Sequence, residues 1–378
     1  MKVAICGGGV VGACLAFELG RRGAEVAIVE STGVGHAASG KSGGFLALDW
    51  CRGTPLDALA RRSFARHAEL AAELDGGPDG ARDWGYRRMD TLGVVLSERR
   101  DLRAYGRHPS PAWLDEAAAV HGRLGGTETT AQIDPGGFTR AMVEAAVANG
   151  AKLIAARVTG VSRKGARASG VTAVGRDGVA HSIAADAVVI AMGPWSMLAR
   201  SWLPLPPVYG LKGHSFVLQS IDAIPAEALF VEYEAADGET FSPEIVPRAD
   251  GTTYVCGVSS QAPLPEDPAD VTADAGAHAR LLAMTARVAP VLGRAAIVKT
   301  QACFRPVTAD GLPFIGAVPG VPGAFVATGH SVWGMLNAPA TGEAMTELIL
   351  DGTARHVNLA PFAPGRLRAI DPRRVPRA

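Results

Sequence analysis

A strand, a glycine-rich turn, a helix and a second strand are predicted within residues 1–30. The apolar residues 3–6 indicate a buried strand, residues 11–22 a helix, and residues 25–30 the next strand. A unit of this kind is typical of a parallel sheet that is covered by helices. We therefore expect an α/β fold, in which these residues supply part of the parallel sheet.

The turn itself has the spacing G-x-G-x-x-G, formed by Gly7, Gly9 and Gly12. Gly7 allows the tight turn, Gly9 lets the backbone approach a pyrophosphate at the positive end of the helix, and Gly12 lets the helix pack closely on the strand. Glu30 ends the second strand, where a carboxylate accepts hydrogen bonds from a ribose and repels a 2′-phosphate. A structural turn without a ligand is the alternative. The predicted dinucleotide-binding residues are Gly7, Gly9, Val10, Val11, Gly12, Glu30 and Ser31.

A second segment rich in serine and glycine follows at residues 33–48. The first motif alone leaves FAD and NAD open as ligands. Ser39, Ser42, Gly43 and Gly44 offer hydroxyl groups and free backbone N–H groups just after the second strand. Such groups suit a longer dinucleotide that extends along the fold, whereas the alternative is an ordinary surface loop.

The composition excludes several classes of partner. Of the 378 residues, 48% are apolar and 20% are charged, as in ordinary soluble domains. Lys plus Arg and Asp plus Glu both number 37, so no net field attracts nucleic acid or an anionic membrane, and we expect a small-molecule partner. No apolar run approaches the roughly 20 residues of a membrane helix, and we expect neither a signal peptide nor a membrane span, because residues 1–6 indicate the start of a strand.

The five cysteines are widely spaced and include no C-x-x-C pair. Neither a disulfide framework nor a zinc site is suggested by this spacing, so no metal is expected. We interpret them as reduced thiols of a cytoplasmic protein. These cysteines are Cys6, Cys14, Cys51, Cys256 and Cys303.

Further elements are predicted along the rest of the chain. The alanine-rich, charged residues 54–75 and 113–121 indicate helices, and residues 138–161 indicate a helix, a glycine stop and a strand. Short strands broken by Pro and Gly over residues 208–260 suggest an antiparallel sheet. The remaining predictions are a helix over 271–289, strands over 296–306 and 323–329, and a long helix over 335–351.

With these elements in place, three C-terminal motifs carry a family resemblance. "AMGPW" spans residues 191–195, "DGLPFIG" spans 310–316, and "TGHSVWGMLNAPATGEAM" spans 328–345. Together with the two glycine-rich segments, they resemble the D-amino-acid oxidase superfamily of FAD-dependent oxidoreductases, which includes glycine oxidase and sarcosine oxidase. The resemblance covers the whole chain in order, and the last motif looks nearest to a little-characterised subgroup.

The resemblance implies a Rossmann-like FAD-binding domain made of several segments, and a second lobe with an antiparallel sheet that covers the flavin and binds the substrate. We expect the FAD-binding domain to comprise residues 1–80, 136–207 and 299–378. The substrate-binding lobe would comprise residues 81–135 and 208–298.

The same resemblance implies further cofactor contacts. Val158 would meet the adenine through its backbone, and Gly193 would close a turn over the cofactor. Gly329, His330 and the helix start at Gly334, Met335 and Leu336 would approach the pyrimidine end of the flavin. A helix N-terminus stabilises the negative charge of a reduced flavin there. His330 is either an extra donor or a structural hydrogen-bonding group.

An anchor for the substrate is expected rather than a catalytic triad, because the cofactor carries the chemistry. Arg305 resembles the arginine that grips the substrate carboxylate in glycine oxidase, and a guanidinium fork suits that task. The alternative is an Arg305 that pairs with Asp310 or caps a turn. Trp50 and Tyr254 are expected as cavity walls, although core packing also explains them.

Cys303 lies at or near the position of the flavin-linked cysteine of sarcosine oxidase. A covalent link is therefore a possibility, but a buried free thiol and non-covalent FAD are the expectation. Sarcosine oxidase also uses a lysine near the flavin to activate oxygen, and no equivalent lysine is found in "GTTYVCGVSS", residues 251–260. Lys41, Lys212 and His214 are expected in solvated or hydrogen-bonded roles.

The resemblance implies an enzyme that oxidises the C–N bond of an amine or amino acid by hydride transfer to flavin N5, with oxygen as the acceptor. One alternative is an FAD-dependent dehydrogenase of an unusual biosynthetic substrate that uses another acceptor. A second is a flavin-binding assembly or interaction protein with little turnover. The sequence leaves the substrate and the oligomeric state open.

Overall fold

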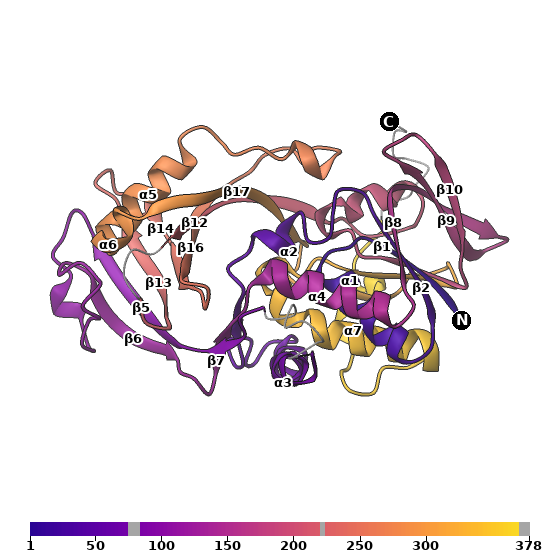
Figure 1. The fold of residues 1–378 in the computed structure, drawn as a ribbon, viewed down its shortest axis with the longest axis horizontal. Coiled ribbons are helices and arrows are strands. Elements are labelled where there is room, and N and C mark those ends of the chain that lie inside the picture. The colour runs from indigo at the N-terminus through magenta and orange to yellow at the C-terminus, as the bar shows by residue number, and fades with distance from the viewer. Residues whose placement is uncertain (75–83, 220–223, 370–378) are drawn as a thin grey trace.

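The computed structural model describes residues 1–74, 84–219 and 224–369, which form two lobes along the long axis of the molecule (Figure 1). The first lobe is built on an eight-stranded sheet of order β10-β9-β8-β2-β1-β11-β19-β18. Its central strands β8, β2, β1, β11 and β19 are parallel. The strands are β1 (Lys2–Cys6), β2 (Glu25–Glu30), β8 (Lys152–Lys164), β9 (Arg167–Gly175), β10 (Ala180–Ala184), β11 (Ala187–Ile190), β18 (Phe314–Ala317) and β19 (Ala324–Thr328).

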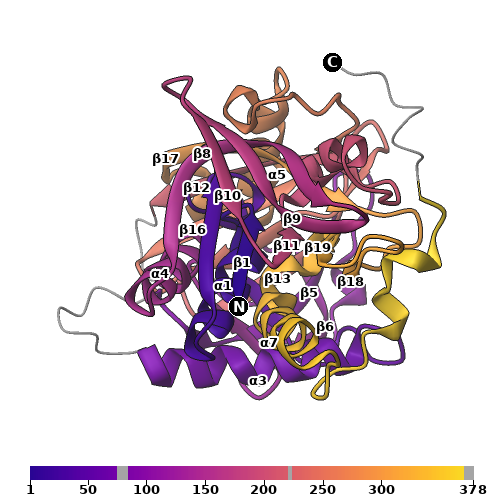
Figure 2. The ribbon, with the colours of Figure 1, turned by 90° about the vertical axis from the view of Figure 1, so that its right-hand side faces the viewer.

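Helices cover one face of this first sheet (Figure 2). They are α1 (Val10–Arg21), α4 (Pro135–Ala148) and α7 (Gly334–Asp351), and α3 (Asp57–Leu74) packs on the far side of α7. Helices α1 and α7 approach closely, because a Cβ atom on Gly342 would lie 2.8 Å from the carbonyl carbon of Cys14. The core between sheet and helices includes the fully buried Ile5, Leu15 and Phe138. The predicted strand–turn–helix–strand unit is confirmed.

The second lobe contains another sheet, of order β17-β12-β16-β15-β13-β5-β6, with β14 paired to β13. Every neighbouring pair is antiparallel except β13 and β5, which run parallel, so the predicted antiparallel sheet is present with this one difference. The strands are β5 (Asp90–Ser97), β6 (Ala119–Gly125), β12 (Tyr209–Gln219), β13 (Glu227–Glu234), β14 (Thr240–Phe241), β15 (Glu244–Pro247), β16 (Thr252–Ser260) and β17 (Ala296–Val307).

Helices α5 (Ala277–Val288) and α6 (Pro290–Gly293) pack on one face of the second sheet. Phe216 and Val255 of the sheet and Leu281 of α5 are fully buried in that contact. Side chains alternate between the two faces of a strand, so the residues between these point away from α5. The other face is therefore free to form the wall of a cavity.

Short elements complete the structure. A three-stranded sheet joins β3 (Phe45–Ala47), β7 (Thr130–Gln132) and β4 (Arg87–Arg88). The short helices are α2 (Ala38–Lys41), η1 (Arg103–Tyr105), η2 (Gly193–Ser201), η3 (Pro268–Asp270), η4 (Ser331–Trp333), η5 (Ala360–Phe362) and η6 (Pro364–Arg366). Among the described residues, no helix is both long and apolar enough to cross a bilayer.

The helix predicted over residues 113–121 is wrong. Strand β6 begins at Ala119, and Ala119 and Val120 pair with Val95 and Val94 of β5. Alanine favours helices only weakly, so pairing with a neighbouring strand and burial outweigh its propensity.

One of the expected domain boundaries can be located against the elements. The boundary after residue 80 lies outside the described residues. The boundary at residue 299 falls inside β17, which pairs with β12 from Ala296 to Val307. Cys303 and Arg305 are thus part of the second sheet.

Helix α7 contains Pro339, whose missing N–H leaves the carbonyl of Met335 without its usual helical partner. The imidazole Nε2 of His67, on α3, lies 3.0 Å from that carbonyl oxygen and 3.2 Å from the carbonyl oxygen of Leu336. The hydroxyl of Ser63 accepts a hydrogen bond from the backbone N–H that follows the proline. His67 of α3 therefore replaces the donor that the proline lacks, and Ser63 of α3 binds the next backbone N–H.

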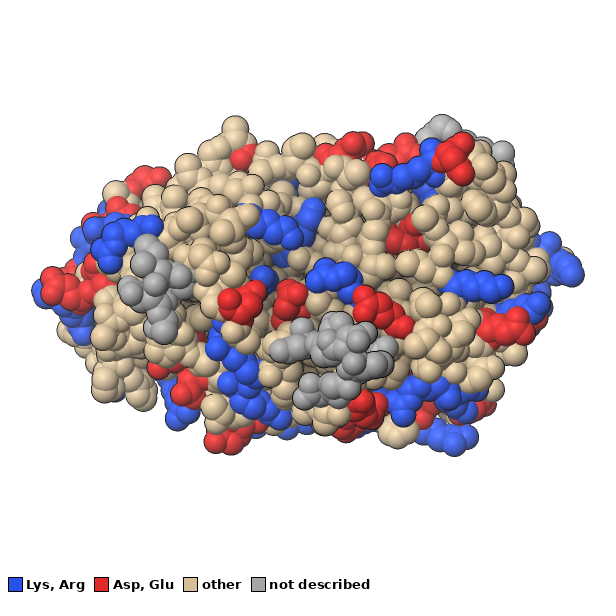
Figure 3. Space-filling view, viewed as in Figure 1, with Lys and Arg blue, Asp and Glu red and all other residues tan. Residues whose placement is uncertain are grey.

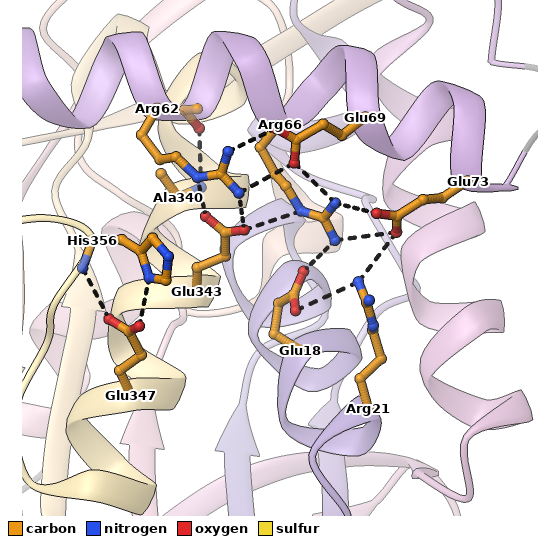
Figure 4. A network of polar contacts seen from close by, with 11 residues as sticks. Glu18, Arg21, Arg62, Arg66, Glu69, Glu73, Ala340, Glu343, Glu347 and His356 are labelled. Atoms are coloured by element: carbon orange, nitrogen blue, oxygen red, sulfur yellow. Dashed lines mark hydrogen bonds and ion pairs between the residues drawn. The ribbon is translucent and has the colours of Figure 1, made fainter.

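A network of ion pairs also joins α3 to α1 and α7 (Figure 4). Its centre is Arg66, whose side chain is only 4% exposed. Arg62 lies beside it and binds Glu343 of α7 at 2.6 Å. The carboxylates within 4 Å of the Arg66 guanidinium are Glu18 (2.9 Å), Glu69 (3.2 Å), Glu73 (2.6 Å) and Glu343 (3.2 Å).

On the face of the molecule drawn in Figure 3, basic and acidic residues are interspersed, in keeping with the zero net charge.

Candidate active site

A cavity of about 510 Å³ is lined by residues of both lobes. Most of the residues that the sequence analysis singled out meet there, although they come from widely separated segments. The predicted residues that line it are Gly7, Gly9, Val10, Val11, Glu30, Ser31, Ser39, Ser42, Gly43, Gly44, Trp50, Val158, Gly193, Tyr254, Cys303, Arg305, Gly329, His330, Gly334 and Met335.

At one end of the cavity, the chain turns from β1 into α1 at Gly7, which has φ +113°. A Cβ atom on Gly7 would lie 2.4 Å from the carbonyl oxygen of Ala191, and one on Gly12 would lie 2.1 Å from the carbonyl oxygen of Gly7. Gly12 does not line the cavity, but this contact agrees with its expected packing role. A side chain at Gly7 or Gly12 would therefore push the turn apart.

Two polar side chains reach this turn from neighbouring segments. The Glu30 carboxylate accepts a hydrogen bond from the Gly8 N–H at 2.7 Å. The Ser39 hydroxyl accepts one from the Val10 N–H at 2.9 Å, at the first turn of α1. The positive end of α1 and the end of β2 thus face the same space, as a dinucleotide requires.

The middle of the cavity is bordered by the serine and glycine segment. The hydroxyl of Ser42 is buried and has no hydrogen-bond partner among the described residues. Gly43 lies against the Tyr254 ring, because a Cβ atom there would come within 3.1 Å of two ring carbons. An unpaired buried hydroxyl costs free energy unless a ligand binds it. Ser42 therefore fits a polar ligand that passes along this segment.

The N-terminus of α7 forms another wall, with Gly334 and Met335 at the cavity. Its first N–H groups lack helical acceptors and carry partial positive charge. His330 lies just before the helix and contacts the Thr341 hydroxyl at 3.2 Å, and burial lowers the pKa of His330 to about 4. Leu336 does not reach the cavity: its side chain is 1% exposed and belongs to the hydrophobic core, because the helix turns it inward.

The roof of the cavity is the free face of the second sheet. Arg305 of β17 donates a hydrogen bond to the Ser259 hydroxyl at 2.5 Å. Asp310, the alternative partner for Arg305, instead binds Arg366 at 2.8 Å. Within the described residues no carboxylate lies within 4 Å of the Arg305 guanidinium. Arg305 is thus available to an anionic ligand.

Three further groups at the cavity have shifted pKa values: Cys303 and Tyr254 of the roof, and Lys41 of α2. Burial raises the pKa of the Cys303 thiol, with Lys41 and Arg305 opposing it. Burial lowers the pKa of Lys41, whose Nζ donates to the Ala302 carbonyl at 3.2 Å. The Tyr254 hydroxyl donates to the Lys41 carbonyl at 3.2 Å, and burial raises its pKa. A thiol that burial keeps protonated is a poor nucleophile.

Lys212 and His214, by contrast, have structural partners. The Nζ of Lys212 binds Asp274 at 2.5 Å, and Nε2 of His214 accepts the Asp274 backbone N–H at 3.0 Å. Both therefore hold the loop before α5 against β12.

An aromatic wall closes the side of the cavity beneath the second sheet. The rings of Phe45 and Trp50 lie 5.0 Å apart, and those of Trp50 and Phe230 lie 4.6 Å apart. Trp333 lies 6.5 Å from Trp50, edge to face. Phe230, Trp333 and Glu244 line the cavity without having been predicted. The alternation of residues 228–234 could have placed Phe230 on one face of a strand, but no local signal shows which face is the cavity.

Comparisons with known proteins agree with this architecture. A family model described as FAD dependent oxidoreductase (DAO) matches residues 2–348. A putative oxidoreductase of Schizosaccharomyces pombe is 30% identical, over 96% of this chain and 97% of its own length. Glycine oxidase of Geobacillus kaustophilus is 32% identical, over 96% of both chains.

Solved structures show the same similarity. The crystal structure of glycine oxidase from Geobacillus kaustophilus superposes with a TM-score of 0.78, at 29% identity, over 97% of this chain and 99% of that one. Glycine oxidase from Bacillus cereus gives a TM-score of 0.76 at 25% identity, over 94% and 98% of the two chains. The chain therefore belongs to the DAO family of FAD-dependent oxidoreductases, and within it the protein is similar to glycine oxidases.

Proposed function

We propose that the protein oxidises the C–N bond of an amine or amino acid and passes the electrons to oxygen. The observation that carries this proposal is Arg305, whose guanidinium lies in the cavity wall without a carboxylate partner among the described residues. A guanidinium fork binds a carboxylate with two parallel hydrogen bonds. A substrate carboxylate held there would have its neighbouring carbon fixed in the cavity.

The residues of the cavity fit FAD. The α1 turn and Glu30 would hold the adenosine and pyrophosphate, and the unpaired Ser42 hydroxyl supplies a hydrogen bond farther along. The positive end of α7, at Gly334, would face the pyrimidine edge of the flavin. When bound, FAD accepts a hydride from the carbon that carries the nitrogen. We expect FAD to be bound without a covalent link, because burial keeps the Cys303 thiol protonated.

The chain's own contribution is to bind, orient and exclude water. Trp50 and Phe230 form an edge-to-face aromatic wall that would displace water from the substrate. Tyr254 is held by its hydrogen bond to the Lys41 carbonyl, so its ring forms a fixed surface against Gly43. A small amine or amino acid is therefore the expected substrate.

Because the five cysteines are all free thiols, we also propose a cytoplasmic location.

Anaerobic titration of the purified protein tests the activity. Glycine, sarcosine and a panel of amino acids are added, and bleaching of the flavin absorption band is recorded; hydrogen peroxide is then measured after oxygen is admitted. Reduction followed by peroxide formation supports the proposal. If no amine or amino acid bleaches the flavin, the proposed function is wrong, and bleaching without peroxide would reject oxygen as the acceptor.

The anchor is tested with Arg305→Met, and the exposed Arg294→Met serves as the control. We expect KM for an amino acid to rise by about 10- to 100-fold in Arg305→Met, because the variant loses the binding free energy of a charge-assisted hydrogen-bonded pair. An unchanged KM would remove Arg305 from the proposal.

Acid precipitation of the unaltered protein tests the mode of flavin binding. The yellow colour should stay in the supernatant. Colour that stays in the pellet, and that is absent from the pellet of Cys303→Ser, would show a covalent link.

A further inference from the structure

Glu244 is a carboxylate in the roof of the cavity that belongs to no predicted motif. It lies at the start of β15, where it pairs with Cys256 of β16 on one side and with Phe230 of β13 on the other. Cys256 in turn pairs with Ser215 of β12. Residues that are directly paired in a sheet point to the same face, and all four of these line the cavity. Glu244 therefore points toward the substrate space.

Among the described residues, the groups around Glu244 include no direct ion-pair partner for its carboxylate. Its one described hydrogen bond comes from the Cys256 thiol, at 3.6 Å between Sγ and Oε2. No cation lies within 4 Å of its carboxylate among the described residues. The charged and titratable groups that face it are Arg305 of β17 and Cys256 and Tyr254 of β16. Burial raises the pKa of Glu244, and Arg305 opposes that rise.

A carboxylate in this position suits a cation. A buried charge is costly unless an opposite charge or hydrogen-bond donors accompany it, and a thiol is a weak donor. Phe230 is the direct neighbour of Glu244 in the sheet, and its ring contacts Trp50. Aromatic rings attract cations, so the carboxylate and the rings favour the same kind of ligand group.

Resting on the proposed function, we propose that Glu244 binds the ammonium group of the substrate and accepts one of its protons before the C–N bond is oxidised. The proton passes from the ammonium nitrogen to a carboxylate oxygen, which leaves a neutral amine and a neutral Glu244; no electrons move in this step. The released lone pair on nitrogen is what the following oxidation requires. Arg305 and Glu244 together select a zwitterion, so amino acids are preferred over simple amines.

The pH dependence of kcat/KM tests this role with Glu244→Gln, which keeps the size of the side chain but cannot take the proton. In the unaltered protein, kcat/KM for glycine or another active amino acid should be nearly constant around neutral pH. In Glu244→Gln it should fall at least tenfold at pH 7 and rise roughly tenfold per pH unit toward the pKa of the free amine. Glu244→Asp should restore the flat profile. The matched control is Glu232→Gln, at an exposed position in β13.

Binding supplies a second readout that does not depend on turnover. Perturbation of the flavin spectrum by acetate, which lacks the amine, should be as strong or stronger in Glu244→Gln, because a neighbouring negative charge has been removed. Binding of glycine, measured anaerobically or by calorimetry, should weaken at least tenfold. The ratio of flavin to protein absorbance must match the unaltered protein, which shows that the variant is folded.

The outcomes separate the two proposals. A pH profile in Glu244→Gln that matches the unaltered protein overturns the role of Glu244 but leaves the proposed function standing. If no amine reduces the flavin of the unaltered protein, the proposed function fails, and glycine binding by Glu244→Gln still decides whether Glu244 recognises an ammonium group. Equal loss of acetate and glycine binding would show a structural role only and overturn the inference.

Discussion

The Nε2 atom of His67 lies 3.0 Å from the carbonyl oxygen of Met335, across the contact between α3 and α7. Pro339 deprives this carbonyl of its helical donor, and His67 replaces the missing bond. Met335 lines the cavity, so the same contact fixes the helix end that would face the flavin. A residue with no place in the active site thus supports its geometry.

We expect His67→Leu to lower the free energy of unfolding by about 1–3 kcal/mol, the cost of leaving a buried carbonyl unpaired. The measurement is urea unfolding followed by circular dichroism. His108→Leu, at an exposed position, is the control and should change stability by less than about 0.5 kcal/mol. Equal stability of the two variants would show that the Met335 carbonyl does not need the imidazole.

Stability should also fall as the pH drops from about 6.5 to 4. Burial lowers the pKa of both His67 and His330 to about 4, whereas an unfolded histidine titrates near 6.5. In this window the unfolded state binds more protons than the folded state, so the free energy of unfolding decreases with falling pH, by up to about 3 kcal/mol per histidine. Unfolding at pH 7, 6 and 5 measures the slope. His67→Gln should reduce it, and an unchanged slope in that variant would contradict the assignment to His67.

Arg66→Met should destabilise the protein by about 3–5 kcal/mol, because it removes the nearest cation of the partly buried Glu18 and leaves it only Arg21, at 3.9 Å. Arg61→Met is a matched control on the same helix: Arg61 is 40% exposed and pairs only with Asp57 among the described residues, so its loss should cost less than about 1 kcal/mol. Thermal and urea unfolding compare the two. Similar small losses in both variants would mean that the network of Figure 4 contributes little.

Gly9→Ala should weaken FAD binding at least tenfold while the FAD-free protein stays folded. Gly9 has φ −75°, which any residue adopts, and a Cβ atom there would meet only the Ser39 hydroxyl at 3.1 Å, at the edge of the cavity. Calorimetric titration with FAD and the ratio of flavin to protein absorbance measure the effect. Gly122→Ala, where a Cβ atom meets nothing within 4 Å, is the control. Normal FAD affinity in Gly9→Ala would place the pyrophosphate elsewhere.

The elements that could be predicted from the sequence are those set by local backbone conformation and by the local pattern of apolar residues. The turn at Gly7 requires a residue that tolerates φ +113°, and the strand that ends at Glu30 follows from its apolar pattern. The long helix of residues 334–351 was expected at nearly its observed bounds for the same reason. The helix expected over residues 113–121 is absent because alanine content is a weak signal, and pairing with β5 decides the conformation from Ala119 onward.

By itself, the sequence determined the glycine-rich turn, the strand–helix–strand unit around it and the family, because each depends on motifs of residues that are close in the chain. Only the tertiary structure decided which side chains face the cavity. Glu244 and Phe230 meet there because the pairing of β15 with β13 sets their register, and a shift of one strand by one residue would put the two side chains on opposite faces. His67 completes a helix more than 260 residues away for a similar reason: its partner is chosen by packing, which no local pattern records.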